Sequence, residues 1–234
     1  MSYFDFKNFR IYHDRCAMKV GTDGVLLGAW APVEKSKRIL DIGTGSGLVA
    51  IMMAQRSDAE IVGVELDTEA SSQALENAQN SPYASRIQII NADILEFSSQ
   101  APFDTIVSNP PFFENSLECP EEGRNRARHT SSLPLNELIE SAFRLLTDGG
   151  TFSVILPSDV AQEFIGACIT HHFTPTRITS VKTIPRKAPK RMLMCFKKGI
   201  HTDTLLRDEL TLAAPSGERS EAYKVLTKDF YLDK

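Results

Sequence analysis

The residues best suited to chemistry lie in the run 104–115, DTIVSNPPFFEN, where a short apolar strand ends on an amide, two prolines and two aromatic residues. A residue that precedes proline is held in an extended conformation, which turns the Asn109 side chain outward from the strand end. Pro110 and Pro111 lack an N–H group, so their carbonyl oxygens stay available to a ligand. The Asn109 side-chain oxygen and the Pro110 carbonyl could then accept both N–H bonds of a planar amine, while Phe112 offers a face for stacking. We therefore expect Asn109, Pro110, Pro111 and Phe112 to be catalytic residues acting on an amine nitrogen.

A glycine-rich turn contains a second group of candidate site residues. The sequence DIGTGSG places an acid and three glycines between a strand and a helix, namely Asp41, Gly43, Gly45 and Gly47. Glycines there allow a sharp turn and a close approach of the backbone to a ligand. Glu65 ends the next strand, 22 residues after Gly43, where an acid accepts hydrogen bonds from ribose hydroxyls, and Asp93 ends the third, within reach of an adenine amine. The spacing Gly-x-Gly-x-Gly after an acid favours S-adenosylmethionine over a nicotinamide dinucleotide, whose pattern is GxGxxG.

The elements that must position these residues alternate regularly. Apolar runs predict strands over 38–43, 60–67, 86–93, 103–109 and 151–157, and helical periodicity predicts helices over 46–56, 68–80, 135–150 and 158–171. Two further strand-like runs, TRITSVKTI and RMLMCF, flank PRKAPK and are expected to pair antiparallel. This order predicts an α/β fold, a Rossmann-like doubly wound, mostly parallel seven-stranded sheet with an antiparallel last strand.

Length and composition indicate a single domain. A chain of 234 residues suits one α/β domain, here divided into an amino-terminal segment (1–37), to which the family resemblance described below assigns a cofactor-covering role, a core (38–200) and a carboxyl-terminal extension (201–234). The first 20 residues lack an apolar signal region, and the longest apolar run is about half the length of a membrane span. The four cysteines form no CxxC pair. We therefore expect a cytoplasmic protein with reduced thiols, no metal and no membrane partner.

Positive charge is concentrated although the net charge is −4. The stretch 164–202 holds eight Lys or Arg residues and no acid, and all 30 acidic residues lie elsewhere. Two basic loops are expected beside the Asn109 edge, with candidate nucleic-acid contacts at Arg124, Arg126, Arg128, Arg186, Lys187, Lys190 and Arg191. The alternative is that these charges are simply solvated.

Four segments carry a resemblance to a known family: HDRCAMKVGTDGVLLGAWAP, ILDIGTGSG, SNPPFF with the Arg-rich loop after it, and SEAYKVLTKDFYL. From about residue 4 onward the chain resembles the bacterial class I methyltransferases that modify N6 of adenine 37 in tRNA1(Val). The resemblance implies S-adenosylmethionine contacts at the glycine loop, Glu65 and Asp93, with Lys19 and Thr22 covering the methionine end. It also implies an amine clamp from Asn109 to Phe112. Phe112 stands where many relatives have Tyr, which keeps the stacking and loses a hydroxyl contact.

The sequence leaves other functions open. Glutamine-N5 methylation of a translation factor suits the same clamp, but those enzymes usually carry a separate helical amino-terminal domain, and only about 37 residues precede the first strand here. N6-adenine methylation of rRNA or DNA is a further alternative, although a DNA enzyme would need target-recognition elements. A non-enzymatic RNA-binding module with a degenerate cradle is disfavoured because both constellations are intact. His13 and Asp14 are expected to order the amino-terminal segment rather than to act as a general base.

Overall fold

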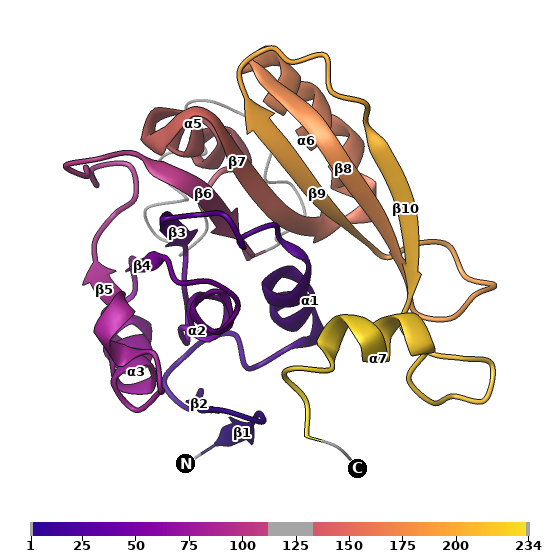
Figure 1. Ribbon diagram of the computed structural model, residues 1–234, viewed down its shortest axis with the longest axis horizontal. Coiled ribbons are helices and arrows are strands. Elements are labelled where there is room, and N and C mark those ends of the chain that lie inside the picture. Colours follow the sequence, from indigo (N-terminus) through magenta and orange to yellow (C-terminus); the bar gives the residue numbers. More distant parts are fainter. Residues whose placement is uncertain (1, 112–132, 233–234) are drawn as a thin grey trace.

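The computed structural model describes residues 2–111 and 133–232 (Figure 1). The strands are β1 (Tyr3–Asp5), β2 (Arg10–Tyr12), β3 (Arg38–Ile42), β4 (Glu60–Glu65), β5 (Ile87–Asn91), β6 (Phe103–Ser108), β7 (Leu146–Pro157), β8 (Phe173–Lys182), β9 (Arg191–Lys198) and β10 (Leu206–Thr211). The helices are α1 (Thr22–Trp30), α2 (Leu48–Arg56), α3 (Thr68–Gln79), the short η1 (Ala84–Arg86), α5 (Leu135–Leu145), α6 (Ser158–Thr170) and α7 (Glu221–Thr227).

One large sheet organises the chain, in the order β10-β8-β9-β7-β6-β3-β4-β5. β9 runs antiparallel to both of its neighbours, and the other pairs in this sheet are parallel. The predicted doubly wound class and the antiparallel pairing of the two strands around PRKAPK are therefore confirmed. The strand order reverses between β3 and β6, and sheets of this kind bind ligands at the carboxyl ends of the strands beside such a switch point.

The sheet has eight strands where the sequence indicated seven. The additional strand, β10, comes from the expected carboxyl-terminal extension and pairs in parallel with β8. Its sequence, LRDELT, is too polar to stand out as a strand, and only Leu210 within it is buried. Charged pairs between the two strands accompany the ladder, Arg177 with Asp208 and Lys182 with Glu209.

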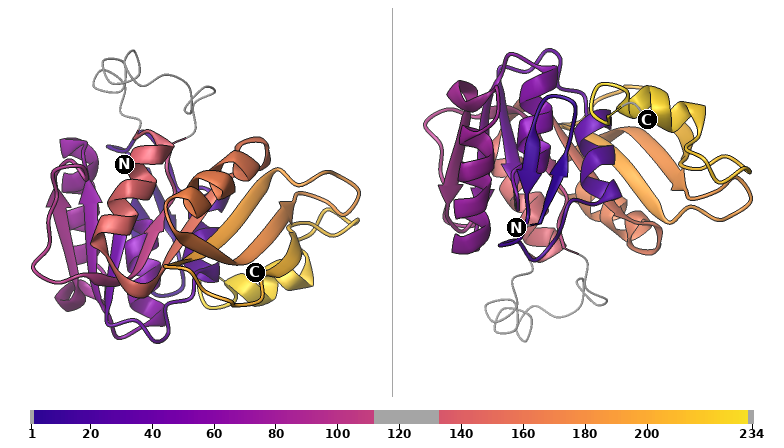
Figure 2. Two further views of the ribbon diagram at one scale, coloured as in Figure 1. Left: turned by 90° about the horizontal axis from the view of Figure 1, so that it is seen from above. Right: turned by 90° about the horizontal axis from the view of Figure 1, so that it is seen from below.

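Helices cover both faces of the sheet, as Figures 1 and 2 show. α5 and α6 pack on one face in a core with Leu40, Ile106 and Phe152. α1, α2 and α7 pack on the other face, and α3 lies beside α2 under β5 (Figure 1). The loops after the parallel strands, including those after β3 and β6, are therefore brought to one edge of the sheet.

The predicted helix 135–150 is wrong at its end. The helix stops at Leu145, and β7 begins at the next residue. Leu146 is buried and pairs with Phe103 of β6, so pairing with the sheet draws it out of the helical path. The glycines at 149 and 150, expected to end the helix, lie within β7.

Segments from both ends of the chain pack together. Phe230, after α7, is buried in one cluster with Phe6, Phe9 and Ile11 against α1 and α2. The Lys7 backbone N–H donates to the Phe230 carbonyl at 2.8 Å. The two terminal segments thus pack on α1 and α2 together. The three segment boundaries expected from the sequence stay a prediction. Among the described residues, no helix is both long and apolar enough to cross a membrane.

Candidate active site

The glycine loop joins β3 to α2 in a conformation that only glycine adopts readily. Gly43, Gly45 and Gly47 have φ angles of 68°, 56° and 79°. The Gly43 N–H donates to the Val64 carbonyl at 2.9 Å, which anchors the loop to β4. A Cβ atom added at Gly43 or Gly45 would meet no atom within 4 Å. These two residues therefore border open space, as a cradle for a ligand requires.

Gly47 and Asp41 support the loop from the protein side. A Cβ at Gly47 would lie 3.4 Å from Ala74, so this glycine lets α2 approach α3 closely. The Asp41 carboxylate accepts from the Thr44 hydroxyl at 2.6 Å and from the Ala50 N–H at 3.1 Å. Burial raises the pKa of Asp41 to about 7. We expected a cofactor contact at Asp41, but its hydrogen bonds brace the loop; direct contact with a ligand stays a prediction.

Two acids lie at the ends of neighbouring strands, as the sequence predicted. Glu65, the last residue of β4, accepts from the Gly45 N–H at 2.8 Å and from the Asp67 N–H at 3.0 Å. Asp93 lies just beyond β5 and accepts from the Leu95 N–H at 2.9 Å. Each carboxylate keeps further lone pairs for a ligand, because its oxygens can accept about four hydrogen bonds in all. Both acids thus lie on the side of the loop where a nucleoside was expected.

The segment directly before α1 contains the next residues expected at the site. The His13 ring is buried; its Nδ1 accepts from the Val20 N–H at 3.2 Å, and its Nε2 lies 2.7 Å from the Ser2 hydroxyl. Burial, together with the Lys19 charge, lowers the pKa of His13. Both ring nitrogens are therefore engaged in ordering this segment, which agrees with the role expected for His13. Lys19 and Thr22 are exposed at the end of the same segment, and their expected contact with the cofactor's methionine end stays a prediction.

Asn109 follows β6 at the switch point beside the glycine loop. Ser108, the residue before it, pairs with Ile42 and donates from its hydroxyl to the Ile42 carbonyl at 2.9 Å. Since Gly43 directly follows Ile42, the two predicted constellations are brought side by side. The side-chain oxygen of Asn109 is buried and has no hydrogen-bond partner among the described residues. Such an acceptor is costly to leave unpaired, and a donor from a ligand would satisfy it.

The surroundings of Asn109 are small and rigid. Gly24 in α1 faces it, since a Cβ there would lie 3.8 Å from the Asn109 amide nitrogen. Pro110 is buried and Pro111 partly buried, so the two prolines pack against the protein. Phe112 and the three arginines of the first basic loop, Arg124, Arg126 and Arg128, lie outside the described residues.

Fewer basic residues in and around the second loop are available to a ligand than the charge count implied. Of the eight basic residues in 164–202, five form ion pairs: Arg177, Lys182, Arg191, Lys197 and Lys198. The Arg191 Nε in particular donates to the Asp23 carboxylate of α1 at 2.8 Å, so this residue links β9 to the helix beside the site. Arg186, Lys187 and Lys190 are exposed in the loop 183–190, and no ion pair is seen for them within the described ranges. Because β8 runs parallel to β7 and β6, this loop leaves the same edge of the sheet as Asn109.

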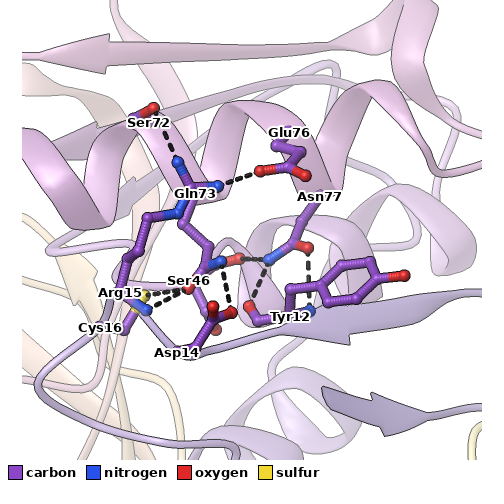
Figure 3. A network of polar contacts seen from close by, with 9 residues as sticks. All are labelled: Tyr12, Asp14, Arg15, Cys16, Ser46, Ser72, Gln73, Glu76 and Asn77. Carbon is purple, nitrogen blue, oxygen red and sulfur yellow. Dashed lines mark hydrogen bonds and ion pairs between the residues drawn. The ribbon is translucent and has the colours of Figure 1, made fainter. Parts of the chain in front are cut away.

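The sequence analysis did not single out two buried amides that connect to the site, Gln73 and Asn77 of α3. Both amides are buried and bond the backbone of the amino-terminal segment, and Asn77 also bonds the Ser46 carbonyl in the glycine loop (Figure 3). Their spacing of four residues places them on one helix face. The only signal in the sequence was a pair of amides on an otherwise apolar face, which does not name its partners.

Comparison with known proteins decides the family. The methyltransferase small domain matches residues 18–182. A tRNA1(Val) (adenine(37)-N6)-methyltransferase from Bacteroides thetaiotaomicron is 47% identical over 98% of this chain and 97% of its own length. A protein of the same name from Phocaeicola vulgatus is 49% identical over 99% of this chain and 98% of its own. The chain belongs to this methyltransferase family. The family resemblance and the expected enzyme class are thus confirmed.

Solved methyltransferase structures share the fold. A predicted O-methyltransferase from Agrobacterium tumefaciens superposes with a TM-score of 0.70 at 23% identity, over 89% of this chain and 96% of that one. A 16S rRNA N2 G1207 methyltransferase from T. thermophilus, in complex with AdoMet and guanosine, superposes with a TM-score of 0.58 at 20% identity, over 84% of this chain and 50% of that one. At these identities the likeness extends to the fold alone.

S-adenosylmethionine is the cofactor of this methyltransferase family, and the site fits it. The open space at Gly43 and Gly45 and the two acids beside it form a cradle. At its edge lies the Asn109 oxygen, an acceptor for which the described residues supply no partner. The glycine loop, Glu65 and Asp93 are the residues that would hold the nucleoside. When bound, the cofactor supplies an activated methyl group.

Proposed function

We propose that this protein methylates the exocyclic N6 of an adenine in the anticodon loop of a tRNA, namely adenine 37 of tRNA1(Val), with S-adenosylmethionine as donor. The observation that carries the proposal is the buried side-chain oxygen of Asn109 beside the glycine loop, which has no hydrogen-bond partner within 2–111 and 133–232. The names of the relatives that are 43–49% identical support the choice of tRNA and of adenine 37. A cytoplasmic location goes with such a substrate and is part of the proposal.

Asn109 and Pro110 would act on the amine directly. The Asn109 oxygen and the Pro110 carbonyl each accept one N–H bond of the adenine amine, which draws the nitrogen towards a tetrahedral geometry and exposes its lone pair. Alignment of the two reacting groups supplies a large part of the rate. No dedicated base is required, because the alkylated amine is strongly acidic and loses its proton to water. This agrees with a His13 ring whose two nitrogens are both engaged.

Two further unpaired atoms support a polar substrate at this edge of the sheet. Ser158 follows β7 and Thr183 follows β8, and the buried hydroxyl oxygens of both lack partners among the described residues. Three neighbouring loops therefore offer polar groups to a ligand, next to the exposed cations of the loop 183–190. A nucleotide base with its phosphates has this combination of polar edges and negative charge.

Radiolabelled S-adenosylmethionine added separately to total tRNA, total DNA and a release factor tests the function. We expect label in tRNA alone, and N6-methyladenosine in its nuclease digest. A transcript of tRNA1(Val) should accept the methyl group, and the same transcript with guanosine at position 37 should not. Label in the release factor would move the function to glutamine methylation, and label in both transcripts would exclude position 37.

A charge reversal in the loop 183–190 should weaken tRNA binding. We expect Arg186→Glu with Lys187→Glu to lower tRNA affinity and to reduce the slope of log affinity against log salt by roughly 1.5, since each phosphate contact contributes about 0.7–0.9. Arg191 is left unchanged because its ion pair with Asp23 would confuse the result. S-adenosylmethionine affinity should not change.

The matched control reverses two exposed lysines at the opposite edge of the sheet, Lys35→Glu with Lys37→Glu. Both double variants alter the net charge equally. Equal losses of tRNA affinity in the two would show a general charge effect and would remove the loop from the binding surface.

A further inference from the structure

Asn77 uses its whole amide group to join two segments that are distant in sequence (Figure 3). Its Oδ1 accepts from the Tyr12 N–H at 2.9 Å. Its Nδ2 donates to the Tyr12 carbonyl and to the Ser46 carbonyl, both at 2.8 Å. The side chain is 1% exposed, so water does not compete for these bonds. One buried amide therefore holds the end of β2 and the glycine loop in a fixed relation.

Gln73 continues this attachment one helical turn earlier. Its Oε1 accepts from the Arg15 N–H at 2.8 Å, and its Nε2 donates to the Asp14 carboxylate at 3.1 Å. At the exposed rim of the same helix, Arg15 pairs with Glu76. The segment 12–16 is thus laid along α3 by two buried amides and one exposed ion pair (Figure 3).

The attached segment borders the cradle. Cys16 Sγ lies 3.6 Å from Gln73 Oε1, on the helix whose Asn77 bonds Ser46 of the glycine loop. Burial, together with the charges of Glu65 and Asp67, raises the pKa of the Cys16 thiol to about 11. Glu65 is the acid that accepts from the Gly45 N–H. From Cys16 the chain runs on to His13's partner Val20 and to α1, whose Gly24 faces Asn109. The segment 12–20 therefore lies between the acid at one side of the site and the amine clamp at the other.

We propose that Asn77 is a positioning residue of the cofactor site, which couples the order of the segment 12–16 to the conformation of the glycine loop through Tyr12 and Ser46. Without this amide, three backbone groups lose their common partner: the Tyr12 N–H, the Tyr12 carbonyl and the Ser46 carbonyl. The glycine loop and the segment 12–16 can then move independently. Cofactor binding then has to order both, which weakens affinity. By reciprocity, the bound cofactor should protect the segment 12–16 from opening, and this protection should depend on Asn77.

The test compares Asn77→Ala with Glu76→Ala. Glu76 lies on the same helix and binds the same segment, but only at the exposed rim. We expect S-adenosylmethionine affinity, measured by calorimetry well below the unfolding temperature, to fall at least about tenfold in Asn77→Ala and less than twofold in Glu76→Ala. The KM for S-adenosylmethionine should rise in parallel, while kcat at saturating cofactor should change little, a split that a general loss of folded protein does not produce.

Hydrogen exchange of the segment 10–17 supplies the second readout. Cofactor should slow this exchange in the unaltered protein and in Glu76→Ala, and much less in Asn77→Ala. Unchanged affinity and unchanged protection in folded Asn77→Ala would overturn the proposal. Should Asn77→Ala not fold, the same measurements on Asn77→Ser decide, because Ser is neutral and small and its short side chain cannot bridge Tyr12 and Ser46.

This inference depends on the proposed function only through the cofactor. Calorimetry uses the protein and S-adenosylmethionine without tRNA, so the two can fail separately. An unaltered protein that binds the cofactor but does not methylate tRNA would refute the proposed function and leave the role of Asn77 intact.

Discussion

Asn109→Ala is expected to bind S-adenosylmethionine with normal affinity and to methylate adenine 37 roughly 10²–10³-fold more slowly, by analogy with the loss of one oriented polar group at an oxyanion. The expected loss is large because the Asn109 oxygen is buried and has no hydrogen-bond partner in the described part of the chain, so it is available to accept from the adenine amine. The backbone of the site is unaffected by the change, since Ser108 still bonds Ile42. Single-turnover methylation with saturating enzyme measures the chemical step without product release.

The control is Asn80→Ala, which removes an exposed amide at the end of α3 and should leave the rate unchanged. Calorimetry with S-adenosylmethionine shows whether Asn109→Ala retains the cradle. A near-normal single-turnover rate in Asn109→Ala would show that another group orients the amine, and the clamp would then have to be assigned elsewhere.

Gly45→Val should abolish measurable S-adenosylmethionine binding, with an affinity at least about 100-fold lower, which corresponds to about 2.7 kcal/mol. Two effects act together. The φ of 56° at Gly45 is one that β-branched residues rarely adopt, so the loop must change its path or remain strained. In addition, the open space beside Gly45 would be filled by the new side chain, and that space is where the cofactor is expected.

Gly166→Val provides the comparison for this prediction. Gly166 lies in α6, where an added Cβ meets no atom within 4 Å and the backbone is helical. We expect it to bind the cofactor normally. If Gly45→Val also bound S-adenosylmethionine normally, the glycine loop could not be the cradle, and the assignment of Glu65 and Asp93 would lose its basis.

The sequence by itself determined the sheet core and the two constellations at its edge. The spacing of apolar residues that predicts strands and helices is a local property of the sequence. Polar residues at the ends of successive strands predict a ligand site, because parallel strands bring their carboxyl ends to one edge of the sheet. Gly45 and Asn109 therefore could be placed before any contact was known. The pairing of Ile42 with Ser108 in the folded sheet then brings them together.

The tertiary structure alone decided which polar groups are already paired. Asp41 braces Thr44 and Ala50, Arg191 bonds Asp23, and Asn77 bonds Tyr12, 65 residues away. The partners of Arg191 and Asn77 come from other segments of the chain, and residue type and spacing do not state which segments meet. Charge and hydrogen-bonding capacity are read from a sequence, but whether they serve a ligand depends on what remains unpaired after folding. Only the folded arrangement leaves the Asn109 oxygen without a partner among the described residues. It also pairs five of the eight basic residues of the stretch 164–202 with acidic side chains.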